Sequence, residues 1–340
     1  MAFVQDIPLA RSISPPTMRQ IGIIIPTYNA SRYWHALHTG LKAQGISSNQ
    51  VTIVDSSSTD NTPELVLQAG YRLITIPTQS FRHGATRQMA AEAMSSSNFL
   101  MYLTQDAQLC GERPIEKLLR AFWDPEVGAA YGRQLPREDA GPIERHARLF
   151  NYDGATEVRD LESRKHLGFR AAFFSNSFAV YRRTALEEVG GFPNNAIVSE
   201  EVTVAARMLL SGWKTAYEAE ATVIHSHPLT LVQEFSRYFD IGVHHSRERW
   251  LLNEFGGPGG DGRKFVVSQM RYLWKIRPSE IPLAVVRNIS KWCAYKLGIH
   301  ERHLHVALKR VLSAQPNFWR NERTTASSYV RSRDASEIRS

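Results

Sequence analysis

The sequence predicts an α/β fold in which a mostly parallel sheet carries helices on both faces. Short apolar runs rich in β-branched residues alternate with amphipathic stretches through the first 125 residues, which is typical of consecutive βαβ units. Polar clusters follow three of these runs, at the sheet edge where such proteins bind ligands. The 340 residues, 43% hydrophobic and 22% charged, have the composition of a folded globular protein rather than a disordered one.

The first half of the chain supplies four strands and three helices. Strands are expected where apolar runs stop at proline or polar residues, at 21–25, 51–54, 71–76 and 99–103. The intervening helices are expected from Trp34 to a stop at Gly45, from Thr62-Pro63 with proline in the first turn, and at 84–95.

The pattern after residue 125 is less regular. We expect strands at 127–131, 177–181 and 222–225, and a helix at 198–210. From 229 onward only helices are expected, at 229–254, 265–276, 281–297 and 301–312, with a glycine-rich loop at 255–262. The predicted organisation is an N-terminal extension (1–19), an α/β domain (20–228), a basic helical region (229–323) and a flexible tail (324–340).

The positive charge is confined to the C-terminal third. Residues 1–230 carry a net charge of −1, whereas residues 231–340 carry +9, and aromatic residues are interleaved there. A basic, aromatic-rich helical segment can lie on an anionic membrane surface. It can also be an ordinary solvated face. A nucleic-acid partner is disfavoured, because no RRM, KH or zinc-finger pattern is present.

Two features of the sequence predict a cytoplasmic protein. Cys110 and Cys293 are too few and too far apart for a disulfide framework, as expected of a reducing compartment. The first 20 residues lack the layout of a signal peptide, and no apolar run approaches the roughly 20 residues that span a bilayer.

Three polar clusters are expected to meet at one edge of the sheet. They are Thr27-Tyr28-Asn29, the segment Asp55–Asp60, and Thr104-Gln105-Asp106. Helix capping alone could account for any one of these clusters. Their convergence at three strand ends instead favours a binding site. Asp55 can accept a hydrogen bond from a pyrimidine imide or a ribose hydroxyl, beside Thr27 and Asn29, and Arg87 can reach the same nucleotide as a planar donor.

Asp106 is the leading candidate for a metal ligand. A carboxylate that faces a diphosphate needs a divalent cation between the two, and Mg²⁺ or Mn²⁺ accepts oxygen ligands. Because manganese also tolerates imidazole, His225 or His227 could be a second ligand. The alternative for the histidines is a strand-end pair with one ring buried and one solvated.

Glu200-Glu201 is the candidate for proton abstraction. Carboxylates at a helix N-terminus also complement the helix dipole, so their position alone has a structural explanation. A catalytic role for the pair is favoured because the sequence also contains three clusters suited to binding a nucleotide sugar.

The motifs resemble those of the family 2 glycosyltransferases, which have a GT-A fold. The matching segments are 24–29 (IIPTYN), 54–60 (VDSSSTD), 104–107 (TQDA), 190–192 (GGF), 199–201 (SEE) and 212–214 (GWK). The finer segments 81–87 (FRHGATR), 225–227 (HSH) and 234–242 (EFSRYFDIG) look like those of bacterial rhamnosyltransferases that build O-antigen and exopolysaccharide on polyprenyl-diphosphate carriers.

The resemblance implies a role for each matched residue. Those assigned to the nucleotide sugar are Pro26, Thr27, Tyr28, Asn29, Asp55, Ser57, Arg87, Gln105 and Asp106. Gln105 replaces the first aspartate of the family's Asp-x-Asp motif, near the ribose, and Asp106 would also carry the metal. Glu201 occupies the place of the usual aspartate base. Because the pair here is Glu-Glu, the two glutamates are not ranked.

The expected function is inverting transfer of a sugar from a nucleotide donor to a hydroxyl of a glycan or polyprenyl-diphosphate-linked acceptor in surface polysaccharide synthesis. L-Rhamnose from dTDP-rhamnose is the preferred donor. The enzyme would lie on the inner face of the plasma membrane as a peripheral protein. The alternatives are a transferase that uses a UDP-linked sugar and a carbohydrate-binding protein without turnover.

Overall fold

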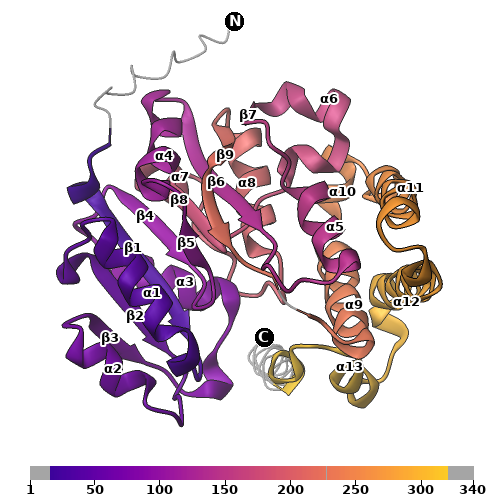
Figure 1. Ribbon diagram of the computed structural model, residues 1–340, viewed down its shortest axis with the longest axis horizontal. Coiled ribbons are helices and arrows are strands. Elements are labelled where there is room, and N and C mark those ends of the chain that lie inside the picture. Colours follow the sequence, from indigo (N-terminus) through magenta and orange to yellow (C-terminus); the bar gives the residue numbers. More distant parts are fainter. Residues whose placement is uncertain (1–15, 227, 321–340) are drawn as a thin grey trace, which may run out of the picture.

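A nine-stranded sheet forms the centre of the molecule (Figure 1). The computed structural model describes residues 16–226 and 228–320. Eight strands lie in the order β3-β2-β1-β4-β8-β6-β9-β5, and β7 pairs with β9. The strands are β1 Ile21–Thr27, β2 Val51–Asp55, β3 Arg72–Thr75, β4 Phe99–Leu103, β5 Gln108–Cys110, β6 Val127–Leu135, β7 Glu157–Arg159, β8 Phe178–Arg182 and β9 Lys214–Ile224.

The predicted parallel sheet is found in its first half, and the second half is mixed. Strands β3, β2, β1 and β4 pair in parallel, as does β6 with β9. The pairs β4–β8, β6–β8, β5–β9 and β7–β9 are antiparallel. Parallel pairing requires a long crossover between strands, and the later strands are not each followed by one.

Helices cover both faces of the sheet, as predicted. In the central strand β1, Ile21, Ile23 and Ile25 join the core on one face while Ile24 joins the core on the other, so the whole run is apolar. The helices of this part are α1 Ser31–Ala43, α2 Thr62–Gln68, α3 His83–Ala93, α4 Pro114–Arg120, α5 Pro142–Asn151, α6 Arg164–Leu167, α7 Arg183–Glu188 and α8 Glu200–Leu210. Helices α1 and α4 pack on the first face, and α3, α7 and α8 on the second.

The C-terminal region is helical, as predicted, but several boundaries differ, and the expected helix at 301–312 begins only at Val306. The expected single helix at 229–254 is α9 Leu231–Arg247 and α10 Arg249–Phe255, because Glu248 leaves the helical conformation (φ −100°, ψ 51°). The glycines at 259–262 form the first turn of α11 Gly259–Ile276 rather than a loop. Helices α12 Ile281–Ile299 and α13 Val306–Leu312 follow.

The C-terminal helices share apolar clusters with the α/β part. Leu251 and Phe255 pack with Ala206 of α8, and Ile197 packs with Phe239 and Trp319. Helices α11 and α12 lie side by side at the edge of the molecule opposite β3 and α2 (Figure 1). The proposed boundary at 228/229 stays a prediction, and the predicted tail at 324–340 lies outside the described residues.

Helices α9 and α12 approach closely through two glycines. A Cβ added to Gly298 would lie 2.1 Å from the Phe239 carbonyl oxygen, and one added to Gly242 would lie 2.3 Å from that of Tyr295. Only glycine allows backbones to meet at this distance. Across residues 16–226 and 228–320, no helix is both long and apolar enough to cross a bilayer.

Candidate active site

The ends of β1 and β2 are joined by side chains of the first two polar clusters. Thr27 is paired with Asp55 in register, and the Thr27 hydroxyl donates a hydrogen bond of 2.9 Å to Asp55 Oδ1. The Ser58 amide donates to Asp55 Oδ2 at 2.8 Å, and the Ser58 hydroxyl donates to Oδ1 at 2.5 Å. Because Asp55 is fully buried, these bonds both satisfy its charge and fix the loop that follows β2.

The first and third clusters are joined through backbone atoms. Gln105 Oε1 accepts a hydrogen bond of 2.8 Å from the Tyr28 amide, and Gln105 Nε2 donates to the Tyr28 carbonyl at 3.2 Å. The Tyr28 side chain remains 48% exposed. Asn29 Oδ1 accepts a bond of 2.8 Å from the Thr59 amide. The three clusters therefore form one continuous rim, with Pro26 half-buried within β1.

Asp106 and His225, two of the predicted metal ligands, lie together. His225 Nε2 is 3.4 Å from Asp106 Oδ1, and both side chains are about one-tenth exposed. The third predicted ligand, His227, lies outside the described residues. Within the described residues, no group of three or more His, Cys, Asp or Glu side chains is placed to hold a metal.

Gln134 and Arg148 orient the imidazole of His225. Arg148 Nη1 donates to Gln134 Oε1 at 2.8 Å, which identifies that atom as the amide oxygen because a guanidinium can only donate. His225 Nδ1 lies 2.9 Å from the same oxygen. Nδ1 must therefore carry a proton, and in neutral His225 the lone pair is on Nε2, facing Asp106. A carboxylate oxygen and an imidazole lone pair that face each other form a donor set suited to Mg²⁺ or Mn²⁺.

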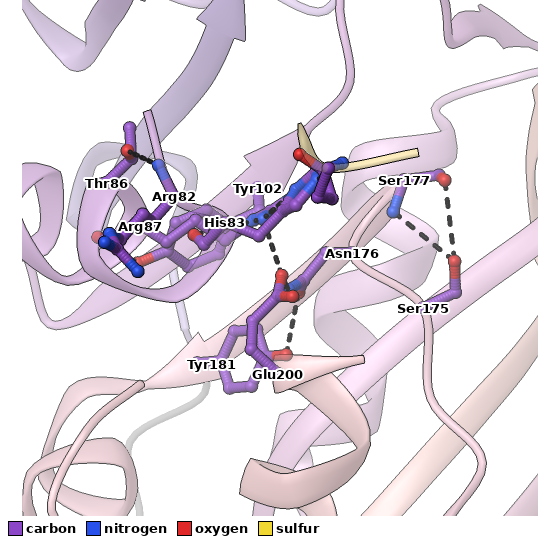
Figure 2. Close-up of polar contacts among 11 residues, drawn as sticks. Arg82, His83, Thr86, Arg87, Tyr102, Ser175, Asn176, Ser177, Tyr181 and Glu200 are labelled. Atoms are coloured by element: carbon purple, nitrogen blue, oxygen red, sulfur yellow. Dashed lines mark hydrogen bonds and ion pairs between the residues drawn. The ribbon is translucent and has the colours of Figure 1, made fainter. Parts of the chain in front are cut away.

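A buried ion pair joins α3 to α8. Arg87 of α3 places Nη1 2.5 Å from Glu200 Oε1 of α8, and both side chains are less than one-tenth exposed. Asn176 Nδ2 donates to the same carboxylate oxygen at 3.2 Å, and the Tyr181 hydroxyl donates to Asn176 Oδ1 at 2.7 Å. Figure 2 shows Glu200 beside Asn176 and Tyr181, with Arg87 and His83 on the other side.

This pair gives Arg87 a partner that the sequence did not predict. A buried carboxylate requires a compensating cation, and Arg87 supplies it to Glu200. The contact with a nucleotide that was expected of Arg87 stays a prediction. Burial acts to raise the pKa of Glu200, but the charges of Arg87 and His83 outweigh it and hold that pKa below its ordinary value.

Glu201, the next residue, is in a different electrostatic state. Its side chain is half-buried, and burial together with the negative charge of Glu200 raises its pKa to about 8. The positive charge of Arg87 and, more weakly, that of Arg237 on α9 act in the opposite direction on this pKa. Two adjacent carboxyl groups with opposite pKa shifts have different chemical roles, and the one titrating near neutral pH is suited to accept a proton.

The backbone is strained at three points beside these residues. Asn29, Ser57 and Ser199 have φ values of 49°, 58° and 59°. A left-handed conformation is costly for a residue other than glycine and is found most often at functional sites. Asn29 and Ser57 are predicted site residues and Ser199 precedes Glu200, which supports a common function for these loops.

Sequence reasoning missed several residues that complete the site. Gln134 and Arg148 lie on β6 and α5, where no motif marks them, and Asn176 precedes β8. His83 and Arg237 were within the quoted motifs but received no role. Arg87 Nη1 donates to the His83 carbonyl at 3.2 Å. The charge of Arg237 lowers the pKa of Glu201. The segment 81–87 could have identified His83, because Arg87 lies on it, whereas the segment 234–242 that contains Arg237 carries no predicted site residue.

Comparison with protein families identifies the chain. The family model for glycosyl transferase family 2 matches residues 22–190. The O-antigen chain rhamnosyltransferase WbaN of Salmonella anatum is 40% identical over 315 residues, covering 92% of this chain and all of the relative. The O-antigen chain rhamnosyltransferase RfbN of Salmonella typhimurium is 39% identical over 313 residues, with the same coverage.

Solved structures support the GT-A fold predicted from the sequence. The mannosyltransferase PcManGT of Pyrobaculum calidifontis, in complex with GDP-Man and Mn²⁺, aligns with a TM-score of 0.53 at 16% identity over 92% of this chain and 88% of its own. Residues 1–349 of TarS of S. aureus, in complex with UDP-GlcNAc, align with a TM-score of 0.53 at 16% identity over 92% of both chains.

The strand ends, the rim and the paired carboxyl groups thus agree with a match that extends over nearly the whole chain. The protein belongs to glycosyltransferase family 2 and is a glycosyltransferase with a GT-A fold.

Proposed function

We propose that this enzyme transfers L-rhamnose from dTDP-rhamnose, with inversion, to a hydroxyl of a glycan carried on polyprenyl diphosphate during O-antigen synthesis. The observation that carries the proposal is the 40% identity to an O-antigen chain rhamnosyltransferase across 92% of the chain. The gathering of the predicted site residues at one edge of the sheet supports it.

Glu201 is the general base in this proposal, and Glu200 is a positioning residue. Glu200 is held in its charged form by Arg87, so it is a weak base. The raised pKa of Glu201 makes it a better proton acceptor. The acceptor oxygen forms a bond to the anomeric carbon while the bond from that carbon to the diphosphate oxygen breaks. The electron pair leaves with dTDP, and the acceptor proton passes to a Glu201 carboxylate oxygen.

The nucleotide sugar is proposed to lie along the rim. Tyr28 has an exposed ring that can stack on the base, and Asp55 retains acceptor capacity beyond its three bonds. Pro26, Thr27, Asn29, Ser57 and Gln105 shape the same surface. Asp106 and His225 would hold a divalent cation, which supplies positive charge to the departing diphosphate. His227 stays a proposed third ligand.

The enzyme is further proposed to lie on the anionic inner face of the plasma membrane through the outer surface of α11 and α12. Apolar and aromatic side chains outside the cavity wall described below are exposed there, as in interfacial helices. They are Trp274, Val285, Val286 and Ile289. Co-sedimentation with vesicles containing phosphatidylglycerol, and its loss in a W274E/I289E variant, tests this part.

The decisive experiment is a panel of nucleotide sugars incubated with the purified enzyme, Mn²⁺ and a lipid-linked acceptor. We expect release of nucleoside diphosphate with dTDP-rhamnose and at least tenfold less with UDP-linked sugars. If nucleoside diphosphate is released faster from a UDP-linked sugar, that sugar is the donor and dTDP-rhamnose is not. Binding of nucleotide sugars without any release would identify a carbohydrate-binding protein instead.

A further inference from the structure

A large cavity lies between the α/β part and the C-terminal helices. Its volume is about 1410 Å³, and its walls come from α5, α9, α11 and α12. This exceeds the roughly 300–1,000 Å³ of an ordinary small-molecule pocket. None of the residues assigned above to the nucleotide sugar lines it, so it provides room for a second substrate.

One end of the cavity adjoins the catalytic groups. Arg148 lines it and also donates to Gln134, which holds His225. Arg237 lines it as well, and its neighbours Phe235 and Tyr238 share an apolar cluster with Ile197 and Val198, which precede α8. A ligand bound against Arg237 therefore lies on the side of the cavity toward the first turn of α8, which carries Glu201.

Arg237, Arg263 and Lys296 are exposed cations of this wall that have no carboxylate partner among the described residues. Arg287 and Lys291 are paired, since they lie 3.0 and 3.1 Å from oxygens of Glu234. Of the three exposed cations, Arg237 is the one on α9. Arg237 forms no ion pair with any described side chain and is exposed. An unpaired guanidinium beside a cavity favours an anionic group, and its fork geometry matches phosphate oxygens.

The part of the wall on α11 and α12 carries apolar side chains as well as charged ones. The apolar ones include Val266, Val267, Leu283 and Trp292, which are 37%, 42%, 45% and 62% exposed. These side chains stand on α11 and α12, the two helices at the outer edge of the molecule (Figure 1). The cavity thus combines an unpaired arginine of α9 with exposed apolar side chains of the two outer helices.

We propose that this cavity binds the acceptor as a lipid diphosphate, with the diphosphate against Arg237 and the hydrocarbon chain along the apolar side chains of α11 and α12. The inference rests on the proposed function, because it assigns a site to the acceptor of that reaction. The glycan attached to the diphosphate then lies between Arg237 and Glu201, so that its hydroxyl can reach the base.

Binding of farnesyl diphosphate to the full-length protein, measured by calorimetry, tests the inference. We expect farnesyl diphosphate to bind at least tenfold more tightly than inorganic pyrophosphate or farnesol, because only it carries both the anion and the chain. R237Q should weaken this binding at least tenfold and leave dTDP binding in Mn²⁺ unchanged. L283S should weaken it about threefold or more.

Two matched variants serve as controls. K275Q removes one positive charge from α11 outside the cavity wall, and V311S makes an apolar-to-polar change at an exposed position of α13. Both should bind farnesyl diphosphate as the unchanged protein does. If R237Q and K275Q weaken farnesyl diphosphate binding equally, Arg237 contributes only to the net charge of the protein. That result would overturn the inference.

The remaining outcomes separate the two proposals. If R237Q weakens dTDP as much as farnesyl diphosphate, or if the two ligands compete, the cavity does not hold a separate acceptor. If pyrophosphate binds as tightly as farnesyl diphosphate, the lipid part is wrong. Failure to bind farnesyl diphosphate by a protein that releases dTDP from dTDP-rhamnose overturns only the cavity assignment. Failure to bind dTDP at all overturns the proposed function.

Discussion

Arg87 Nη1 lies 2.5 Å from Glu200 Oε1, an ion pair between residues 113 positions apart that ties α3 to α8. The contact helps to give the neighbouring carboxyl groups of Glu200 and Glu201 pKa shifts of opposite sign. Glu200 keeps its charge and repels a second charge on Glu201, whose pKa rises. One buried arginine thereby sets the protonation state of the residue next to its partner.

Replacing Glu201 with glutamine should abolish transfer while leaving the protein folded. The amide matches the shape of the protonated carboxyl group but cannot accept the acceptor proton, so dTDP release should fall about 10²–10⁴-fold. Turnover of E201Q near that of the unchanged enzyme would rule out Glu201 as the base. The contrasting variant is E200Q, in which Arg87 loses its charged partner, so its loss of activity should be accompanied by a lower Tm.

The pH dependence of transfer should follow the carboxyl group of Glu201. Its pKa of about 8 in the free enzyme means that the carboxylate form increases as pH rises through that value. Therefore kcat/KM should increase with pH up to about 8 and then level off. The residual activity of E201Q should lack this rise. A profile that is flat between pH 6 and 9 in the unchanged enzyme would contradict the assignment.

The same shift predicts an effect on stability. The native state of Glu201 binds a proton at pH values where the unfolded carboxyl group, with a pKa of 4.5, has lost it. The free energy of unfolding contributed by this group therefore decreases as pH rises from about 4.5 to 8. Glutamine does not titrate, so the Tm of E201Q relative to the unchanged protein should increase between pH 5 and 8. A Tm difference that does not change with pH would argue against the raised pKa.

Breaking the buried pair from the arginine side should destabilise the protein strongly. R87M leaves Glu200 buried without its cation, which costs about 3–5 kcal/mol in comparable sites. The double variant R87M/E200M removes both charges and should be more stable than R87M alone. Urea unfolding of R87M, E200M and R87M/E200M measures the coupling between the two side chains. Additive effects would show that the two side chains do not interact.

Gln134 should affect metal affinity without contacting the metal. Its oxygen accepts from His225 Nδ1 and from Arg148, so Q134L removes the group that orients the ring. Loss of such a partner typically costs 10–100-fold in metal affinity. The Mn²⁺ concentration that half-activates transfer should rise accordingly. S175A removes the acceptor of the Gln134 amide nitrogen and the contacts of Ser175 with Ser177, but leaves the Gln134 oxygen in place, so it should have a smaller effect.

The glycine contact between α9 and α12 should be intolerant of a methyl group. In G298A the new Cβ would meet the Phe239 carbonyl oxygen at 2.1 Å, and relief of such overpacking costs about 1–3 kcal/mol or more. G260A on α11 is the matched control, because nothing lies within 4 Å of the added Cβ. Alanine there should be neutral or stabilise the helix by up to about 1 kcal/mol. Equal Tm values for both variants would show that α12 can shift.

Sequence patterns predicted the first half of the fold well. The isoleucine run at 21–25 has β-branched residues on both faces of the strand, and this pattern is distinctive because both faces are buried. The antiparallel strands were harder to predict. β5 is three residues long and β7 likewise, and strands this short carry no readable periodicity.

The site could be predicted only where its residues followed strand ends or known motifs. Asp106 and His225, 119 positions apart, were paired from their chemistry, and they lie 3.4 Å apart. The two glutamates could not be ranked, because their difference depends on Arg87, which reaches Glu200 only through tertiary packing. Gln134 and Arg148 were missed for the same reason. They act by holding the His225 ring, and neither residue type indicates such a role in a sequence.

The last described segment also contributes to this arrangement of charges. Gln315 Nε2 lies 3.2 Å from His83 Nε2 across 232 positions of the chain, and Trp319 is fully buried. A nascent chain of which only the sheet has left the ribosome therefore lacks Gln315, the neighbour of His83. The surroundings of the Arg87–Glu200 pair are therefore completed only after residue 315 has emerged from the ribosome.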